Sequence, residues 1–308
     1  MGWYIIDFNI FIKKTMDLSK LTPEELVKVN NIDNWKQSLF NCVGVISFVD
    51  KFGISIPSGT GTILIKNLDN NLSKIFLITN KHVLPTHLIS TFITFTLHAP
   101  WSNTKTFKIT IPVYDRNGNI NNLIKFNNQG EDIAVIDFTE AFVRNYGDIR
   151  NLEEHLPPID ILADENNLKK RNLTIGDEIF FIGYPSFFYN KKNSTPLLRS
   201  GVIATDPTEV YHFNTFLKSA FNADKLNGFL IDANVFGGSS GSLVVTKPAL
   251  IQMYNGQIVP STQKGVPCVV GILTHSYPSL NSGDNYQKLG LGGVIKSEYI
   301  IDTINQFL

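Results

Sequence analysis

Residues 228–246 read Gly-Phe-Leu-Ile-Asp-Ala-Asn-Val-Phe-Gly-Gly-Ser-Ser-Gly-Ser-Leu-Val-Val-Thr, so a glycine- and serine-rich turn joins two short apolar runs. Short apolar runs that are bounded by turn residues are typical of β-strands. Glycines permit a tight backbone turn, in which N–H groups can gather beside a serine hydroxyl and stabilise an oxyanion. We therefore expect a strand–turn–strand unit that presents Ser240 as a candidate nucleophile.

Similar short β-type runs extend on both sides of this unit. They occur between residues 43 and 138 and again between residues 178 and 273, separated by Asn-, Gly- and Pro-rich stretches that are typical of turns. Near the N-terminus, Thr22-Pro-Glu-Glu25 has the form of a capping box at a helix start. Ile300, Ile301, Ile304 and Phe307 follow a helical spacing.

These patterns predict an all-β protein made of two six-stranded antiparallel barrels. Residues 1–40 would form a short helical N-terminal extension, and residues 41–150 the first barrel with His82 and Asp132. Residues 151–308 would form a linker, the second barrel with Ser240 and a C-terminal helix.

The composition is that of a globular protein and excludes several partners. Hydrophobic residues make up 43% of the 308 residues, and Lys plus Arg equals Asp plus Glu at 27 each, so no net field favours nucleic acid or an anionic membrane. Cys42 and Cys268 lie in apolar runs, where we expect buried free thiols rather than a disulfide or a metal site. An apolar N-terminal stretch contains Asp7 and lacks a cleavage site, so we expect a cytoplasmic protein, with secretion left open.

Two further segments supply partners for the serine. They are Leu77-Ile-Thr-Asn-Lys-His82-Val and Glu131-Asp132-Ile-Ala-Val-Ile136. A serine hydroxyl is a weak nucleophile until an imidazole accepts its proton and a carboxylate fixes the tautomer of that imidazole. His82 and Asp132 are the candidates for these tasks, and Asp137 is the alternative carboxylate.

These segments, in the order His, Asp, Ser, resemble those of trypsin-like serine peptidases of the chymotrypsin fold. The closest likeness is to disulfide-poor bacterial HtrA-type and glutamyl-endopeptidase-type enzymes, over roughly residues 40–308. Residues 238–242 resemble the motif Gly-x-Ser-Gly-Gly/Ser, residues 79–83 resemble Thr-Ala-x-His-Cys/Val, and residues 132–136 resemble Asp-Ile/Leu-Ala-Val/Leu-Leu/Ile. The resemblance implies an endopeptidase that acts on protein or peptide substrates without a cofactor, with an oxyanion hole formed by the N–H groups of Gly238 and Ser240.

The resemblance also suggests substrate-binding residues. Asn234 would lie at the base of the primary pocket, where its neutral amide argues against a preference for Arg or Lys. The segment 271–276 would run beside the substrate as an edge strand, with Thr274 and His275 in contact with it. Glutamyl endopeptidases have a histidine directly after Gly-Ile, where this chain has Leu273. Both an acidic-pocket role and a plain surface role therefore stay open for His275.

The sequence leaves two alternatives to an active endopeptidase open. The chain could be a catalytically silent binding module, which a carbonyl group pointing into the oxyanion hole would favour. It could also be a latent protease that an activating partner switches on through the extension or through residues 205–227. Ser239 stands where secreted trypsins have an Asp that pairs with a new N-terminus, so that activation route is not expected. HtrA-type sensing through a PDZ domain is not expected either.

Overall fold

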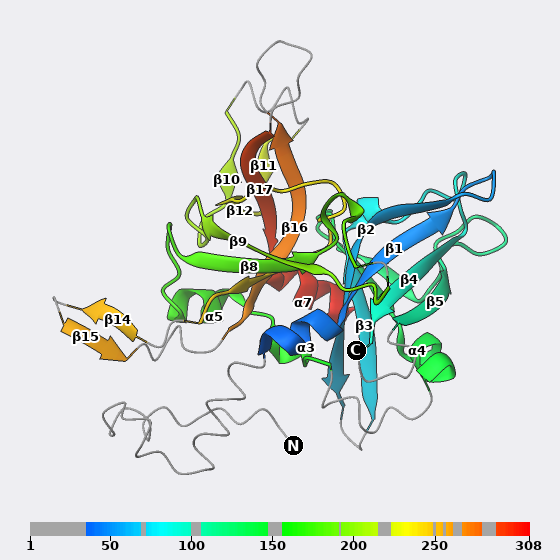
Figure 1. The fold of residues 1–308 in the computed structure, drawn as a ribbon, viewed down its shortest axis with the longest axis horizontal. Helices are drawn as coiled ribbons and strands as arrows, with labels where there is room; N and C mark the ends of the chain where they lie inside the picture. The colour runs from blue at the N-terminus through cyan, green and yellow to red at the C-terminus, as the bar shows by residue number, and fades with distance from the viewer. Residues whose placement is uncertain are drawn as a thin grey trace.

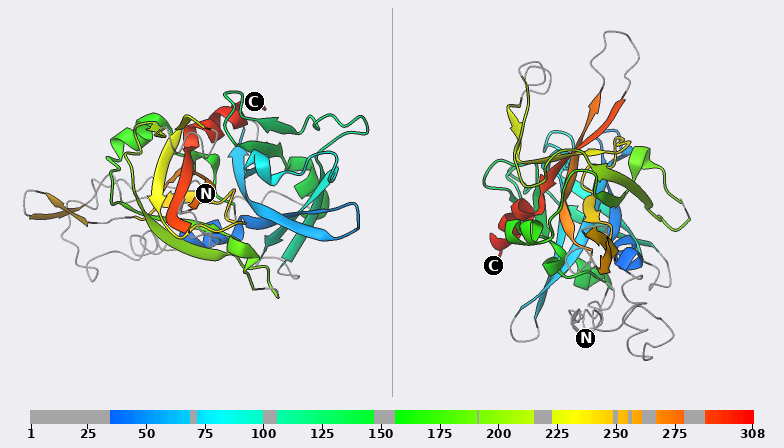
Figure 2. Two further views of the ribbon diagram at one scale, coloured as in Figure 1. Left: turned by 90° about the horizontal axis from the view of Figure 1, so that it is seen from above. Right: turned by 90° about the vertical axis from the view of Figure 1, so that its left-hand side faces the viewer.

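The structure is a computed structural model, and it shows two β-sheet units side by side (Figure 1). Seen from above in Figure 2, the strands of the first unit (blue to teal) lie on one side and most strands of the second (yellow to red) on the other. The predicted extension over residues 1–34 lies outside the described residues, and helix α3 (Trp35–Asn41) leads into the first strand. The described residues are 35–68, 72–99, 106–146, 156–190, 192–214, 223–248, 251–254, 257–260, 267–278 and 288–308.

The first unit is a seven-stranded antiparallel sheet that curls but does not close. Its strand order is β5-β4-β1-β2-β3-β7-β6, which leaves β5 and β6 as its edges. The prediction of a closed six-stranded barrel is therefore met only in part, because this unit is a half-barrel. The strands are β1 (Val43–Val49), β2 (Ser55–Asn67), β3 (Ser73–Thr79), β4 (Phe92–His98), β5 (Thr106–Pro112), β6 (Ile124–Phe126) and β7 (Ala134–Asp137).

The second unit is a closed antiparallel barrel of six strands, as predicted. Its order around the barrel is β12-β17-β16-β13-β8-β9. The strands are β8 (Glu178–Gly183), β9 (Leu197–Ile203), β12 (Gly228–Asp232), β13 (Leu243–Thr246), β16 (Val269–Pro278) and β17 (Lys288–Lys296).

Smaller elements connect and flank these units. Two two-stranded sheets pair β10 with β11 and β14 with β15. Among the described residues, no helix has both the length and the apolar character needed to cross a bilayer. The elements are β10 (Tyr211–His212), β11 (Lys225–Leu226), β14 (Ile251–Tyr254), β15 (Gln257–Pro260), the short 3₁₀ helices η3 (Lys81–Val83), η5 (Ile159–Ile161) and η6 (Pro185–Phe187), and the α-helices α4 (Thr139–Tyr146), α5 (Glu165–Lys170) and α7 (Ser297–Asn305).

The predicted C-terminal helix, α7, follows the second barrel but packs on the first unit. Ile300 and Ile304 are buried, and the Phe307 ring lies 5.5 Å from that of Phe76 on β3. The Asn127 side chain donates hydrogen bonds to the Tyr299 carbonyl and to the Thr303 hydroxyl. Because each buried aliphatic side chain contributes about 1.5–3 kcal/mol, the helix fastens the two units to each other.

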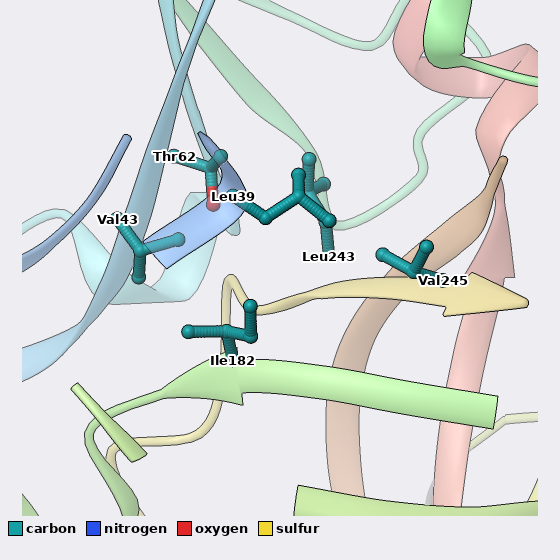
Figure 3. A pocket seen from close by; sticks show the side chains of 6 residues that line it. All are labelled: Leu39, Val43, Thr62, Ile182, Leu243 and Val245. Carbon is teal, nitrogen blue, oxygen red and sulfur yellow. The ribbon is translucent and has the colours of Figure 1, made fainter. Parts of the chain in front are cut away.

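The two units also meet through a dry apolar contact. A cavity of about 10 Å³ lies between them, lined from one side by Leu39, Val43 and Thr62 and from the other by Ile182, Leu243 and Val245 (Figure 3). A space of this size holds at most one water molecule, so it is a packing gap rather than a ligand site. Cys42 and Cys268 are buried free thiols, as predicted, and burial raises the pKa of both.

Candidate functional site

His82 is presented by the turn that ends strand β3. The strand is buried up to Thr79, and the 3₁₀ turn η3 follows at once. Val83 in this turn is fully buried, which anchors the turn, while the His82 side chain keeps 45% of its surface exposed. An apolar strand followed by a buried valine therefore places the imidazole at the surface.

Asp132 lies beside this turn and accepts hydrogen bonds from it. Its carboxylate accepts one from the His82 backbone N–H at 3.0 Å and contacts His82 Nδ1 at 2.5 Å. The Asn80 side chain donates to the Asp132 carbonyl at 2.7 Å. A carboxylate in this position holds the proton on Nδ1 and leaves Nε2 free to accept one.

The electrostatics of Asp132 favour its ionised form. Burial by itself would raise the pKa of this carboxyl, but hydrogen bonds from His82 and Thr274 and the nearby charge of His82 outweigh burial. The pKa of Asp132 therefore lies below its usual value, and the group is an anion at neutral pH. Asp137, the alternative carboxylate, instead forms an ion pair with Lys74 at 3.3 Å.

Ser240 lies in the turn between β12 and β13, and glycines are needed on both sides of it. Gly238 and Gly241 have φ angles of +86° and +90°, a region that other residues rarely adopt. A Cβ atom on Gly241 would lie 1.9 Å from the Thr60 carbonyl oxygen. The Thr60 N–H donates to the Ser240 carbonyl at 2.8 Å, so the turn is held tightly against β2.

Thr274 on β16 joins the two parts of the site. Its hydroxyl donates to Asp132 Oδ2 at 2.6 Å, and its carbonyl accepts a hydrogen bond from Ser240 Oγ at 3.1 Å. One buried residue thus contacts both the carboxylate and the candidate nucleophile. In the described part of the chain no hydrogen bond links Ser240 to His82, as is common for such pairs before substrate binds.

The backbone of the serine turn leaves two N–H groups available. The Gly237 carbonyl accepts a hydrogen bond from the Ser186 N–H at 2.5 Å, and the Gly238 carbonyl accepts one from Thr60 Oγ1 at 2.7 Å. Because C=O and N–H point in opposite directions across a trans peptide, the Gly238 N–H points away from Ser186. Within the described residues, the N–H groups of Gly238 and Ser240 have no acceptor.

A strained turn supports this arrangement, and no motif in the sequence predicted it. Ser186 and Phe187 are consecutive non-glycine residues with φ of 48° and 56°. Phe187 packs against Gly238, where a Cβ atom would meet its ring at 3.0 Å. Such conformations cost on the order of 1–3 kcal/mol each and persist only where the surroundings enforce them.

The predicted substrate-binding residues come before and after the Ser240 turn in the chain. His275 is exposed next to Thr274, and its ring centroid lies 5.9 Å from that of His82. Asn234 is exposed as well, and its Oδ1 faces Gly290, 3.8 Å from where a Cβ atom would stand. Asp232 Oδ1 lies 3.9 Å from the same point. The structure thus adds a carboxylate that the sequence reasoning missed next to the predicted pocket base.

Two strand edges next to Ser240 are open. Strand β2 pairs with β3 only from Thr62 onward, and Ser58 and Gly59 contact Val83. Among the described residues, 55–57 therefore have a strand partner on the β1 side alone. Strand β16 pairs with β13 only up to Ile272, so, within the described residues, 275–277 have a strand partner on the β17 side alone, and Thr274 lies at a bulge between them and Leu273. Open edges of this kind can bind an extended peptide.

Comparison with models of known protein families gives no match for this chain, and comparison with curated proteins gives none either. In the part of the chain that the structure describes, no group of three or more His, Cys, Asp or Glu residues is placed to hold a metal ion.

Proposed function

We propose that this protein is a serine endopeptidase of the chymotrypsin type. The observation that carries the proposal is the meeting of Asp132 and Ser240 on Thr274, with His82 bound to the same carboxylate. In this mechanism Ser240 Oγ attacks the peptide carbonyl, His82 accepts its proton, and Asp132 keeps the imidazole in the required tautomer. The proton then passes to the leaving amine, and water hydrolyses the acyl-enzyme.

The oxyanion of the tetrahedral intermediate would be bound by the N–H groups of Gly238 and Ser240. Both neighbouring carbonyls, of Gly237 and Gly238, are engaged elsewhere, so neither blocks the hole. This argues against a silent binding module, for which a carbonyl turned into the hole was the expected sign. Donors of this type contribute about 3–4 kcal/mol to the transition state.

The open edges of β2 and β16 favour a polypeptide substrate over a small ester. Each edge lies next to Ser240, β2 through the contact of Thr60 with the Ser240 carbonyl and β16 through Thr274. An extended chain could therefore follow β16 up to the cleaved bond and follow β2 after it. The neutral amide of Asn234 is the reason to predict a preference other than Arg or Lys, and the neighbouring Asp232 carboxylate, which is exposed, is the group that would oppose it.

The test is labelling with a fluorophosphonate, read by intact mass. We expect one adduct on the wild type and none on Ser240→Ala. The matched control is Ser239→Ala, because Ser239 is the neighbouring serine but is buried and has an unbonded hydroxyl within the described residues. This control should label like the wild type and should also cleave an unfolded protein substrate.

Two results would contradict the proposal. One is the absence of an adduct on wild-type protein whose circular dichroism shows a folded β-rich chain. The other is an adduct that persists on Ser240→Ala, because the reactive group would then lie elsewhere.

A further inference from the structure

The connection between β1 and β2 exposes an unusual number of apolar side chains. Val49, Phe52, Ile54 and Ile56 are 48%, 75%, 59% and 36% exposed, and they fall within eight consecutive residues. Single exposed apolar residues are normal, but a contiguous group of them marks an interaction surface. We call these four residues the apolar hairpin, which projects from the body of the molecule in Figure 1.

The tip of the apolar hairpin is a fixed turn. Asp50 Oδ1 accepts hydrogen bonds from the backbone N–H groups of Phe52 and Ile54, at 2.9 and 2.8 Å. The Asp50 N–H in turn donates to the Ile54 carbonyl at 3.0 Å, and the Gly53 N–H donates to the Asp50 carbonyl. A turn that is ordered before binding loses less entropy when a ligand arrives.

The apolar hairpin continues the open edge of β2 that leads to Ser240. Thr60 on this strand contacts the Ser240 carbonyl, and Ser58 and Gly59 contact Val83. Within the described residues, 55–57 are exposed and have no strand partner on the side away from β1. At about 3.3 Å per residue, Ile56 and Ile54 lie roughly 13 and 20 Å along the strand from Thr60. A peptide that leaves the serine along this edge reaches them with about its fourth to sixth residue.

We propose that the apolar hairpin binds apolar side chains of the substrate about four to six residues beyond the cleaved bond, an inference that rests on the proposed function. A second copy of the chain fits this surface less well. Pro57 has no N–H to donate, and a bulge between Ile46 and Ser47 interrupts the pairing with β2. Both features oppose edge-to-edge pairing of two strands here, whereas the substrate would pair with β2 only near Ser240 and would contact the hairpin beyond Pro57 through side chains alone.

The experiment measures binding to Ser240→Ala, which holds a peptide intact. Two fluorescent peptides share all residues up to the third after the intended cleavage site and then carry Leu-Phe-Leu or Ser-Gly-Ser. We expect the apolar peptide to bind about tenfold more tightly, as burial of roughly one large apolar side chain predicts. Adding Phe52→Ser and Ile54→Ser should remove this difference.

Controls separate the hairpin from the catalytic site. Ile175→Ser, which removes a side chain that is 60% exposed before β8, should leave the tenfold difference intact. In the chain with Ser240 present, the Phe52→Ser and Ile54→Ser variant should label with fluorophosphonate at the wild-type rate. Its kcat/KM should fall only on the apolar peptide, to the value measured for the Ser-Gly-Ser peptide.

Equal binding of the two peptides to Ser240→Ala would overturn the inference even when wild-type labelling supports the proposed function. A dimer in light scattering that dissociates in the Phe52→Ser and Ile54→Ser variant would overturn it as well, because a second copy would then occupy the surface. Absent labelling together with a retained tenfold difference would instead overturn the proposed function and leave an apolar peptide-binding surface.

Discussion

The two halves of the molecule hold their parts of the site in different ways. The first half fixes Asp132 and His82 with hydrogen bonds from His82 itself and from Asn80, in ordinary backbone conformations. The second half fixes the turn around Ser240 through the Ser186 N–H, which belongs to a turn with two strained residues. The first arrangement contains no strained residue, although Thr274 of the second half also donates to Asp132, whereas the second persists only while its surroundings enforce it.

This difference locates the weak point of the site. If Ser186 and Phe187 relaxed to negative φ, the Gly237 carbonyl would lose its donor, and the Gly237–Gly238 peptide could rotate. The Gly238 N–H would then leave the proposed oxyanion hole, while Asp132 and His82 stayed in place. Under the proposed function, a latent form would therefore differ from the active form in the second half.

The largest effect is expected where the first half is broken. In Asp132→Asn, an amide replaces the acceptor of the His82 Nδ1 proton, so the imidazole takes the tautomer that cannot accept the serine proton. We expect kcat to fall by about 10⁴-fold, with little loss of folded structure. The measurement is the rate of fluorophosphonate labelling, because this follows the reactivity of Ser240 directly.

Asp137→Asn is the matched control for that substitution. Asp137 is engaged by Lys74 and by the Thr139 N–H, so its loss should lower thermal stability slightly and leave labelling unchanged. The assignment of Asp132 would be wrong if Asp137→Asn abolished labelling and Asp132→Asn did not.

A smaller effect is expected where the second half is broken. Ser186→Pro removes the N–H that binds the Gly237 carbonyl and cannot adopt a positive φ. We expect kcat to fall by about 10²–10³-fold, the usual effect of losing an oxyanion donor, with little change in KM. Ser186→Gly keeps the N–H and accepts the left-handed conformation without strain, so its kcat should stay close to that of the wild type.

NMR spectra would decide whether the strained turn of the second half affects the His82–Asp132 pair of the first half. The proton between His82 Nδ1 and Asp132 gives a downfield resonance in NMR spectra, which should persist in Ser186→Pro and vanish in Asp132→Asn. Loss of this resonance in Ser186→Pro would mean that the strained turn supports both halves, and that the first half does not hold His82 and Asp132 independently of it.

Local patterns predicted the main strands but not the short ones β6, β10, β11, β14 and β15. The apolar run that begins at residue 43 and the one at residues 228–232 coincide with β1 and β12, because short apolar runs between turn residues specify strands through contacts with their immediate neighbours. The flanks of His82, Asp132 and Ser240 likewise predicted residues that the structure brings into one region. Their catalytic roles stay predictions.

Long-range geometry was not predictable in the same way. Closure of the first unit would need β5 and β6 to pair across the sheet, which depends on the tilt and stagger of all its strands and not on any one run. The strain at Ser186 arises from contact with Gly237 and Gly238, about fifty residues further along the chain. No property of Pro185-Ser-Phe187 alone indicates it.

The smallest predicted effect concerns His275, a second-half residue whose ring centroid lies 5.9 Å from that of His82. Burial against the site lowers the pKa of His275, the Asp132 charge raises it, and His82 lowers it further. The folded state therefore binds fewer protons than the unfolded state between this lowered pKa and about 6.5. Stability should rise with pH through that window and fall on acidification.

His275→Gln removes this titration and should flatten the dependence of Tm on pH between about 7.5 and 5. Because the ring is partly exposed, water screens its interactions, and we expect the two proteins to diverge at pH 5 by only about 1 °C. Parallel Tm curves for the wild type and His275→Gln would mean that burial at the site does not lower the pKa of His275. The contact between the two halves at the site would then rest on the hydrogen bonds of Thr274 and Thr60.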